Sequence, residues 1–179
     1  GENFMNQMEL KINKEESTSE FQLIISDNHQ KFEVTTDIID LYDIGEFGLN
    51  MLSAFKFYLK YGFGEFEVID TDYNKHHIIL TLDDILVVTE LFNVDRFLET
   101  KVMRFEDIDC WQFIMDLMIC FEKEKTNWNE YIENCIYNER EVEKLEFKQE
   151  KLCEKVKKKL ATFPRYNIDG EDLDFKILK

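Results

Sequence analysis

The side chains best suited to metal or nucleophilic chemistry are three histidines and four cysteines, and their spacing argues against both. His76 and His77 are adjacent in an expected strand, so their side chains point to opposite faces and cannot bind one metal together. The cysteines form no C-x-x-C pair, which is typical of buried, reduced thiols in a cytoplasmic protein. They are Cys110, Cys120, Cys135 and Cys153. We therefore expect no metal site.

Other sequence motifs for catalysis or cofactor binding are also absent or incomplete. The sequence contains no nucleophile elbow, phosphate-binding loop or dinucleotide fingerprint. Residues 70–74 match the start of a calcium-binding loop, but Lys75 stands where that loop needs glycine and Thr81 where it needs glutamate. Paired carboxylates need no motif, and with 38 acidic residues some pairs arise by chance. We expect no cofactor and no catalytic residue, with a carboxylate-based enzyme as an alternative.

Charge divides the chain into two parts. Residues 1–125 carry 11 Lys and Arg against 26 Asp and Glu, a net charge of −15, whereas residues 126–179 carry 11 against 12. A field of this sign repels nucleic-acid phosphates and anionic membranes, and it attracts basic proteins. The acidic part therefore predicts a basic protein partner, with no direct contact to nucleic acid or to a membrane.

Two expected hairpin turns supply the candidate partner-binding residues. Side chains at turns between strands can project into solvent, where a partner can reach them. The predicted contacts are the acidic and aromatic side chains of these turns: Asp70, Asp72, Tyr73, Asp83 and Asp84. Ordinary solubility is the alternative explanation for any single acidic residue among them.

Hydrophobic periodicity predicts an α+β fold, with an antiparallel meander sheet packed against helices. Alternating residues predict an N-terminal three-stranded sheet, followed by a helix that starts near Ile38 and ends at Gly62. Three further strands form the meander, a loop covers residues 95–101, and a helix occupies residues 107–125. The expected strands span residues 8–12, 21–26, 31–35, 65–70, 75–82 and 85–92. Residues 1–125 thus form one acidic body.

A long helix is predicted from an N-cap at Thr126 to Phe163, where Pro164 stops it. Its apolar residues recur at heptad a and d positions, a pattern typical of a coiled-coil seam or of a helix packed within its own chain. We favour packing of residues 126–163 on the body, as a hairpin with the preceding helix, over a homodimer. Residues 164–179 form a tail whose alternating apolar residues suit an added edge strand.

Short segments of the acidic body follow a common pattern of strand and helix signals. They are Lys31-Phe32-Glu33-Val34, Leu52-Ser53-Ala54-Phe55, Phe66-Glu67-Val68, Ile78-Ile79-Leu80, and Phe105 to Phe121. Their order, a short sheet, a helix, a meander and a further helix, resembles small immunity-type proteins of bacterial polymorphic toxin systems. The long C-terminal helix departs from that pattern. The resemblance implies a cytoplasmic binder that neutralises a toxin.

The sequence thus predicts a non-catalytic, acidic binding protein that inhibits a basic partner such as a toxin or nuclease. Three alternatives stay open at this point. They are a homodimer held by the C-terminal helix, a phage-type mimic of nucleic acid directed at a nuclease, and an enzyme that uses paired carboxylates.

Overall fold

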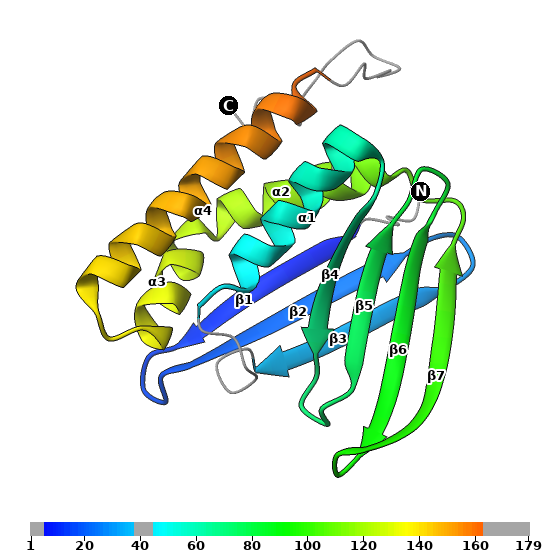
Figure 1. The fold of residues 1–179 in the computed structure, drawn as a ribbon, viewed down its shortest axis with the longest axis horizontal. Coiled ribbons are helices and arrows are strands. Elements are labelled where there is room, and N and C mark those ends of the chain that lie inside the picture. The colour runs from blue at the N-terminus through cyan, green and yellow to red at the C-terminus, as the bar shows by residue number, and fades with distance from the viewer. Residues whose placement is uncertain (1–5, 38–44, 163–179) are drawn as a thin grey trace.

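The computed structural model describes residues 6–37 and 45–162 of the chain, and it confirms the predicted α+β fold (Figure 1). Two antiparallel sheets pack with four helices around a continuous hydrophobic core. The first sheet holds β1 (Gln7–Asn13), β2 (Thr18–Ser26) and β3 (Lys31–Asp37), and the second holds β4 (Gly64–Ile69), β5 (Lys75–Leu80), β6 (Ile85–Asn93) and β7 (Arg96–Phe105). The helices are α1 (Phe47–Tyr61), α2 (Cys110–Lys123), α3 (Lys125–Cys135) and α4 (Glu139–Leu160).

Both sheets form because apolar residues alternate along their strands. In β2, Phe21, Leu23 and Ile25 are fully buried, while the residues between them point away from the core. The second sheet shows the same alternation in β4, where Phe66 and Val68 are buried. In Figure 1 the strands of the second sheet cross those of the first, and the helices gather along one side of the sheets.

The strand β7 is a correction, because the sequence had placed a loop at residues 95–101. A tight turn at Val94 and Asp95 joins β6 to β7, with φ angles of 45° and 64°. Two successive positive φ angles are typical of hairpin turns that usually contain glycine or asparagine, and here neither residue is one of them. The signal of β7 itself is weak because its first seven residues are exposed and so need no hydrophobic alternation.

The expected single helix from residue 126 to residue 163 is also a correction, because it is two helices. Ile136 is extended, with φ −130° and ψ 125°, and ends α3. Asn138 then caps α4, since its side chain accepts hydrogen bonds from the backbone N–H groups of Arg140 and Glu141. The first helix begins at Phe47, and residues 38–44, where its start was expected, lie outside the described part of the chain.

Apolar residues at the heptad a and d positions of residues 126–162 pack into the core of the chain itself. Trp128 and Tyr131 of α3 and Leu145 and Val156 of α4 are all buried. Even Gln149, a polar residue at one of these positions, is buried and donates a hydrogen bond to Asn129. The helix α4 packs mainly along α1, where the sequence had suggested the helix at residues 107–125.

These buried positions are therefore not available as a seam for a second chain. The edge strand expected in residues 164–179 lies outside the described residues.

Candidate functional site

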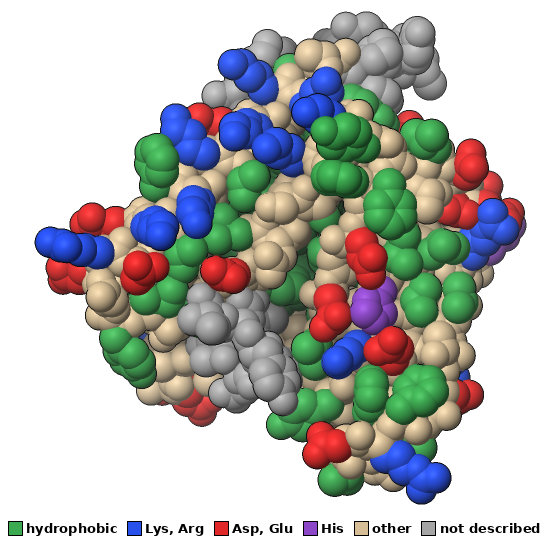
Figure 2. Space-filling model, in the orientation of Figure 1, with side chains coloured by type: hydrophobic (Ala, Val, Ile, Leu, Met, Phe, Trp, Pro, Cys, Tyr) green, Lys and Arg blue, Asp and Glu red, His purple; other side chains and the backbone are tan. Residues whose placement is uncertain are grey.

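The outer face of the second sheet is an exposed surface that combines acidic and apolar side chains. Its residues alternate along the strands with those buried in the core, so they point away from it. We call this surface the open sheet face, and it comprises Glu65, Glu67, Ile69, Lys75, His77, Ile79, Leu86, Val88, Glu90, Phe92 and Val102. Among the described elements, no helix lies across it (Figure 1). Figure 2 shows hydrophobic side chains bordering a group of acidic ones over these strands.

The centre of the open sheet face is a histidine surrounded by three carboxylates. The Nδ1 atom of His77 lies 3.2 Å from a carboxylate oxygen of Glu65 and 3.7 Å from one of Glu67, and its Nε2 atom lies 3.6 Å from Glu90. The four residues come from β4, β5 and β6, with Glu67 directly opposite His77 in the register. We call them the His77 cluster. Even with the imidazole protonated, its three carboxylates leave it negative, which suits a further cation.

Two hollows flank the His77 cluster. The first has a volume of about 590 Å³ and lies between α1 and β4, and its lining includes the aromatic side chains Phe57 and Phe63 and also His77. The second has a volume of about 400 Å³ and lies at the other end of the strands, lined by Tyr73, Lys75 and Phe92 among others. The open sheet face is therefore contoured, with aromatic walls at each end and negative charge between them.

The five residues predicted as partner contacts do not form one surface. Asp70, Asp72 and Tyr73 belong to the β4–β5 turn, whereas Asp83 and Asp84 belong to the β5–β6 turn. These turns lie at opposite ends of β5, whose six residues span about 20 Å. The first turn adjoins the open sheet face, since Tyr73 is exposed and lines its second hollow. Asp72 and Asp83 are exposed as expected.

Asp70 holds its own turn together. Its carboxylate accepts hydrogen bonds from the backbone N–H groups of Asp72 and Asn74, at 2.9 and 3.0 Å. The other carboxylate oxygen lies 2.8 Å from Nε2 of His76, whose Nδ1 lies 2.9 Å from the hydroxyl of Thr89. His76 is buried on the inner face while His77 lies on the outer face, so the two histidines point apart as predicted.

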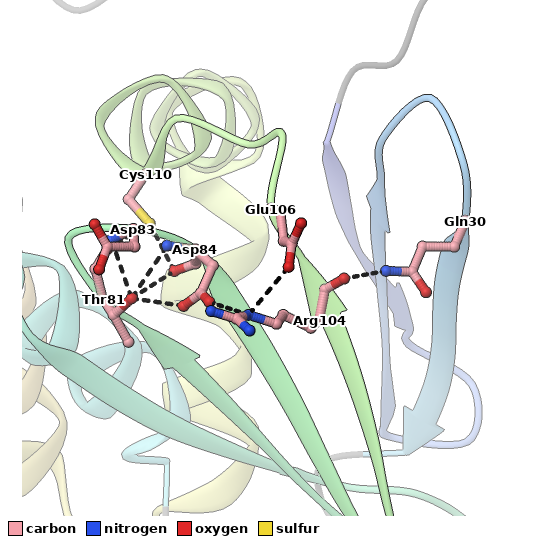
Figure 3. Close-up of polar contacts among 7 residues, drawn as sticks. All are labelled: Gln30, Thr81, Asp83, Asp84, Arg104, Glu106 and Cys110. Carbon is pink, nitrogen blue, oxygen red and sulfur yellow. Dashed lines mark hydrogen bonds and ion pairs between the residues drawn. The ribbon is translucent and has the colours of Figure 1, made fainter.

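Asp84 is a correction to the expectation that turn residues project, because it is buried (Figure 3). Its carboxylate accepts a hydrogen bond from the Thr81 hydroxyl at 2.6 Å and another from Nε of Arg104 at 2.5 Å. The bond from Thr81 lowers the pKa of Asp84; burial opposes this, and the bond and charge of Arg104 add to it. Asp84 thus ties the β5–β6 turn to β7. A partner cannot reach it without opening that junction.

Cys110 closes the same junction from the start of α2. Its thiol donates to the backbone carbonyls of Thr81 and Asp84, at 3.3 and 3.4 Å (Figure 3). Burial raises the pKa of Cys110 to about 11, so the thiol is neutral at physiological pH and a poor nucleophile. The geometry and protonation of this residue fit a structural role.

One pair of facing carboxylates bears on the enzyme alternative. Burial and hydrogen bonding to Glu133 raise the pKa of Glu146, with a smaller contribution from Glu143. The pair belongs to α3 and α4 and lines neither hollow of the open sheet face. Within residues 6–37 and 45–162, no group of three or more His, Cys, Asp or Glu side chains has the geometry of a metal site.

The residues of the His77 cluster were missed by reasoning from turns. The signal was present in the strands, because Glu65 and Glu67 alternate with Phe66 and Val68. Such alternation shows that one face of a strand is buried and the other polar. It does not show whether a helix covers the polar face, and only the arrangement of elements shows that it stays open.

Comparison with known proteins found no matching family model, curated protein or solved structure. No helix in the described part of the chain is long and apolar enough to cross a membrane.

Proposed function

We propose that this chain is a non-catalytic, acidic binding protein that inhibits a basic protein partner, and that it binds this partner through the open sheet face. The observation that carries the proposal is the composition of that face, where apolar and aromatic side chains surround a cluster of carboxylates. Contiguous exposed apolar and aromatic surface is typical of protein interaction sites, and carboxylates within it favour a partner of positive charge.

The His77 cluster supports a basic partner in particular. Glu65, Glu67 and Glu90 surround one imidazole, so an incoming Lys or Arg side chain meets an excess of negative charge. Guanidinium and ammonium groups form their strongest hydrogen bonds with carboxylates. The net charge of −15 on residues 1–125 adds a long-range field that speeds association with a positive surface.

A toxin or nuclease is the class of partner that we propose. Proteins that cleave nucleic acid hold phosphates in positively charged clefts, and an acidic inhibitor can occupy such a cleft after fast, steered association. This assignment also rests on the likeness of pattern to immunity-type proteins. We place the interaction in the cytoplasm.

Affinity capture with two matched variants tests the proposal. The first carries Glu65→Gln, Glu67→Gln and Glu90→Gln, which remove three charges from the open sheet face and keep side-chain size. The control carries Glu15→Gln, Glu16→Gln and Glu20→Gln, exposed residues at the β1–β2 end of the acidic body. Both variants have the same net charge, so any difference between them reports the place of binding.

We expect the unmodified chain and the control to capture the same basic protein from a lysate of the source organism. The open-face variant is expected to lose it, with affinity reduced about tenfold or more. The association rate of the captured protein should fall as salt is raised. Equal capture by both variants would reject the open sheet face as the site, and an acidic or salt-insensitive partner would reject the proposed chemistry.

A further inference from the structure

The second sheet ends in an edge strand whose outer side is largely uncovered. The first seven residues of β7 are exposed, and Phe97, Leu98 and Val102 are 53%, 55% and 61% exposed. Within the described residues, β7 pairs with β6 alone. A long, exposed, partly apolar edge is unusual, because its backbone groups can pair with another strand.

Two other edges of the sheets are covered, and the contrast is informative. In β1, the backbone N–H of Leu10 donates to the carboxylate of Glu124, and its C=O accepts from the side-chain amide of Asn127, both at 2.8 Å. The edge strand β4 packs against α1, where Gly64 faces the backbone of Ala54. Helix residues thus occupy backbone groups of β1 by hydrogen bonds, and α1 lies against the start of β4.

One contact fixes the direction of the backbone groups of β7. The side-chain amide of Gln30, from the β2–β3 turn, donates to the C=O of Arg104, which therefore points away from β6 (Figure 3). In an antiparallel strand, alternate residues direct both N–H and C=O to the same side. Val102 and Thr100 consequently also present their backbone groups at the outer side, where no strand of the described chain reaches them.

The sequence of β7 is complementary to itself about Thr100. Reading outwards from Thr100 in both directions gives Glu99 and Lys101, then Leu98 and Val102, then Phe97 and Met103. When two such strands pair antiparallel across a two-fold axis at Thr100, Glu99 faces Lys101 and Leu98 faces Val102. Regular pairing ends there, because Leu98 is a β-bulge: the register with β6 passes from Glu99 to Phe97. This match favours a second copy of β7 as the strand that pairs with this edge. We propose that β7 binds β7 of a second copy of this chain, in this register.

The side-chain positions agree with that register. Glu99 and Lys101 lie on one face of β7, where their charged groups are 3.9 Å apart, so each can pair with its opposite in the second copy. Val102 lies on the other face, and its counterpart in the second copy is Leu98, the bulged residue that has no partner on β6. On the other side, the C=O of Arg104 is occupied by Gln30, so the proposed pairing spans residues 98–102.

The resulting dimer would join two four-stranded sheets into one continuous sheet, with two open sheet faces side by side. Its interface is a strand pair with a few side chains, smaller than the roughly 1,000 Å² expected of a stable assembly. Each copy also carries a net charge of −16. The dimer should therefore be weak and form at micromolar or higher concentration. It is independent of the apolar stripe on α3 and α4, whose residues Trp128, Tyr131, Leu145 and Val156 are buried within each chain.

Sedimentation velocity over a concentration series tests this dimer with charge reversals. Glu99→Lys and Lys101→Glu each place like charges opposite one another, so each should weaken dimerisation about tenfold or more. The double variant with both substitutions restores opposite charges and should dimerise again. A mixture of the two single variants should form heterodimers for the same reason.

A matched control exists on β1. Lys11 is exposed and Glu9 half-buried, and they are also two residues apart with charged groups 3.9 Å from each other, but the edge of β1 is covered. Glu9→Lys and Lys11→Glu should leave dimerisation unchanged. In addition, Thr100→Pro removes an N–H that points away from β6, so it should abolish the dimer while the chain stays folded by circular dichroism.

Three outcomes would overturn the inference. The first is a chain that remains monomeric up to the highest soluble concentration. The second is a dimer that the charge reversals on β7 do not weaken, or that the control reversals weaken as much. The third is protection of β7 from hydrogen exchange only when the basic partner is present, which would assign the edge to that partner. The first two outcomes do not depend on whether the open sheet face binds a partner, so they distinguish failure of the dimer from failure of the proposed function.

Discussion

The two edges of the second sheet show opposite solutions to the same structural problem. At β4 the helix α1 packs so closely that Gly64 has no room for a side chain, because a Cβ atom would collide with the carbonyl oxygen of Ala54. At β7 no strand or helix of the described chain packs on the outer side, where Gln30 makes one contact at Arg104, and the first seven residues are exposed. The comparison separates the molecule into a part where sequence is constrained by packing and a part that is available for contacts with other molecules.

The largest expected effect on stability comes from a substitution at β4, where α1 packs closely. Gly64→Ala places a methyl group against the backbone of α1, which cannot move as the end of a flexible side chain can. We expect a loss of about 3 kcal/mol in the free energy of unfolding. The matched change on the open edge, Thr100→Ala, should alter it by about 0.5 kcal/mol at most. Urea denaturation of both variants measures the contrast, and equal midpoints would contradict it.

The next effect concerns the junction that ties β7 to the body. Asp84→Asn removes a buried carboxylate that accepts hydrogen bonds from Thr81 and Arg104. Its expected cost is about 2 kcal/mol, since hydrogen bonds to charged groups are worth about 1.5–3 kcal/mol. The adjacent Asp83→Asn is the control, because Asp83 is exposed and its substitution should cost less than about 0.5 kcal/mol. A similar loss in both variants would show that the turn, and not the junction, is being measured.

The same carboxylate predicts a dependence on pH. The pKa of Asp84 is lower in the folded chain than its ordinary value of 3.8, so the unfolded chain binds more protons in this range. The stabilisation is therefore complete above the unfolded pKa and is lost as pH falls through the folded pKa. Urea midpoints of the unmodified chain and of Asp84→Asn should converge below about pH 4. A difference between the two urea midpoints that stays constant or widens on acidification would contradict this prediction.

The smallest expected effect is on the open sheet face. Replacing Glu65, Glu67 and Glu90 with glutamine removes three negative charges whose charged partner in the described structure is His77. We expect the free energy of unfolding to change by less than about 0.5 kcal/mol per site, although capture of the partner is lost. Thermal unfolding alongside the capture assay separates the two effects. A large loss of stability would mean that these acids serve folding.

The strands and helices of the core could be predicted because each leaves a periodic signal in the sequence. Phe21, Leu23 and Ile25 alternate as a half-buried strand must, and Gly62 ends α1 in a left-handed conformation, with φ 78°. The strand β7 could not be predicted in this way, because a strand exposed along most of its length needs no alternation. The break between α3 and α4 was hidden because the heptad pattern continues across it.

The candidate site was harder to predict than the fold, for a related reason. Turn chemistry identified Asp70 and Asp84 correctly as turn residues, but their carboxylates are engaged within those turns. Residues that strand alternation merely marked as polar, such as Glu67 and His77, form the exposed cluster instead. Local sequence pattern predicts the direction in which a side chain points from its strand or turn. It does not predict which distant residues that side chain contacts.

By itself, the sequence determined the fold class, the excess of negative charge on residues 1–125 and the opposite directions of His76 and His77. These depend on composition and on the local geometry of strands and helices. The tertiary structure decided which sheet face and which edge stay uncovered, and which carboxylates are engaged in the body. These features depend on contacts between segments far apart in the chain, such as Gln30 with Arg104 and Glu124 with Leu10, which leave no local periodicity to detect.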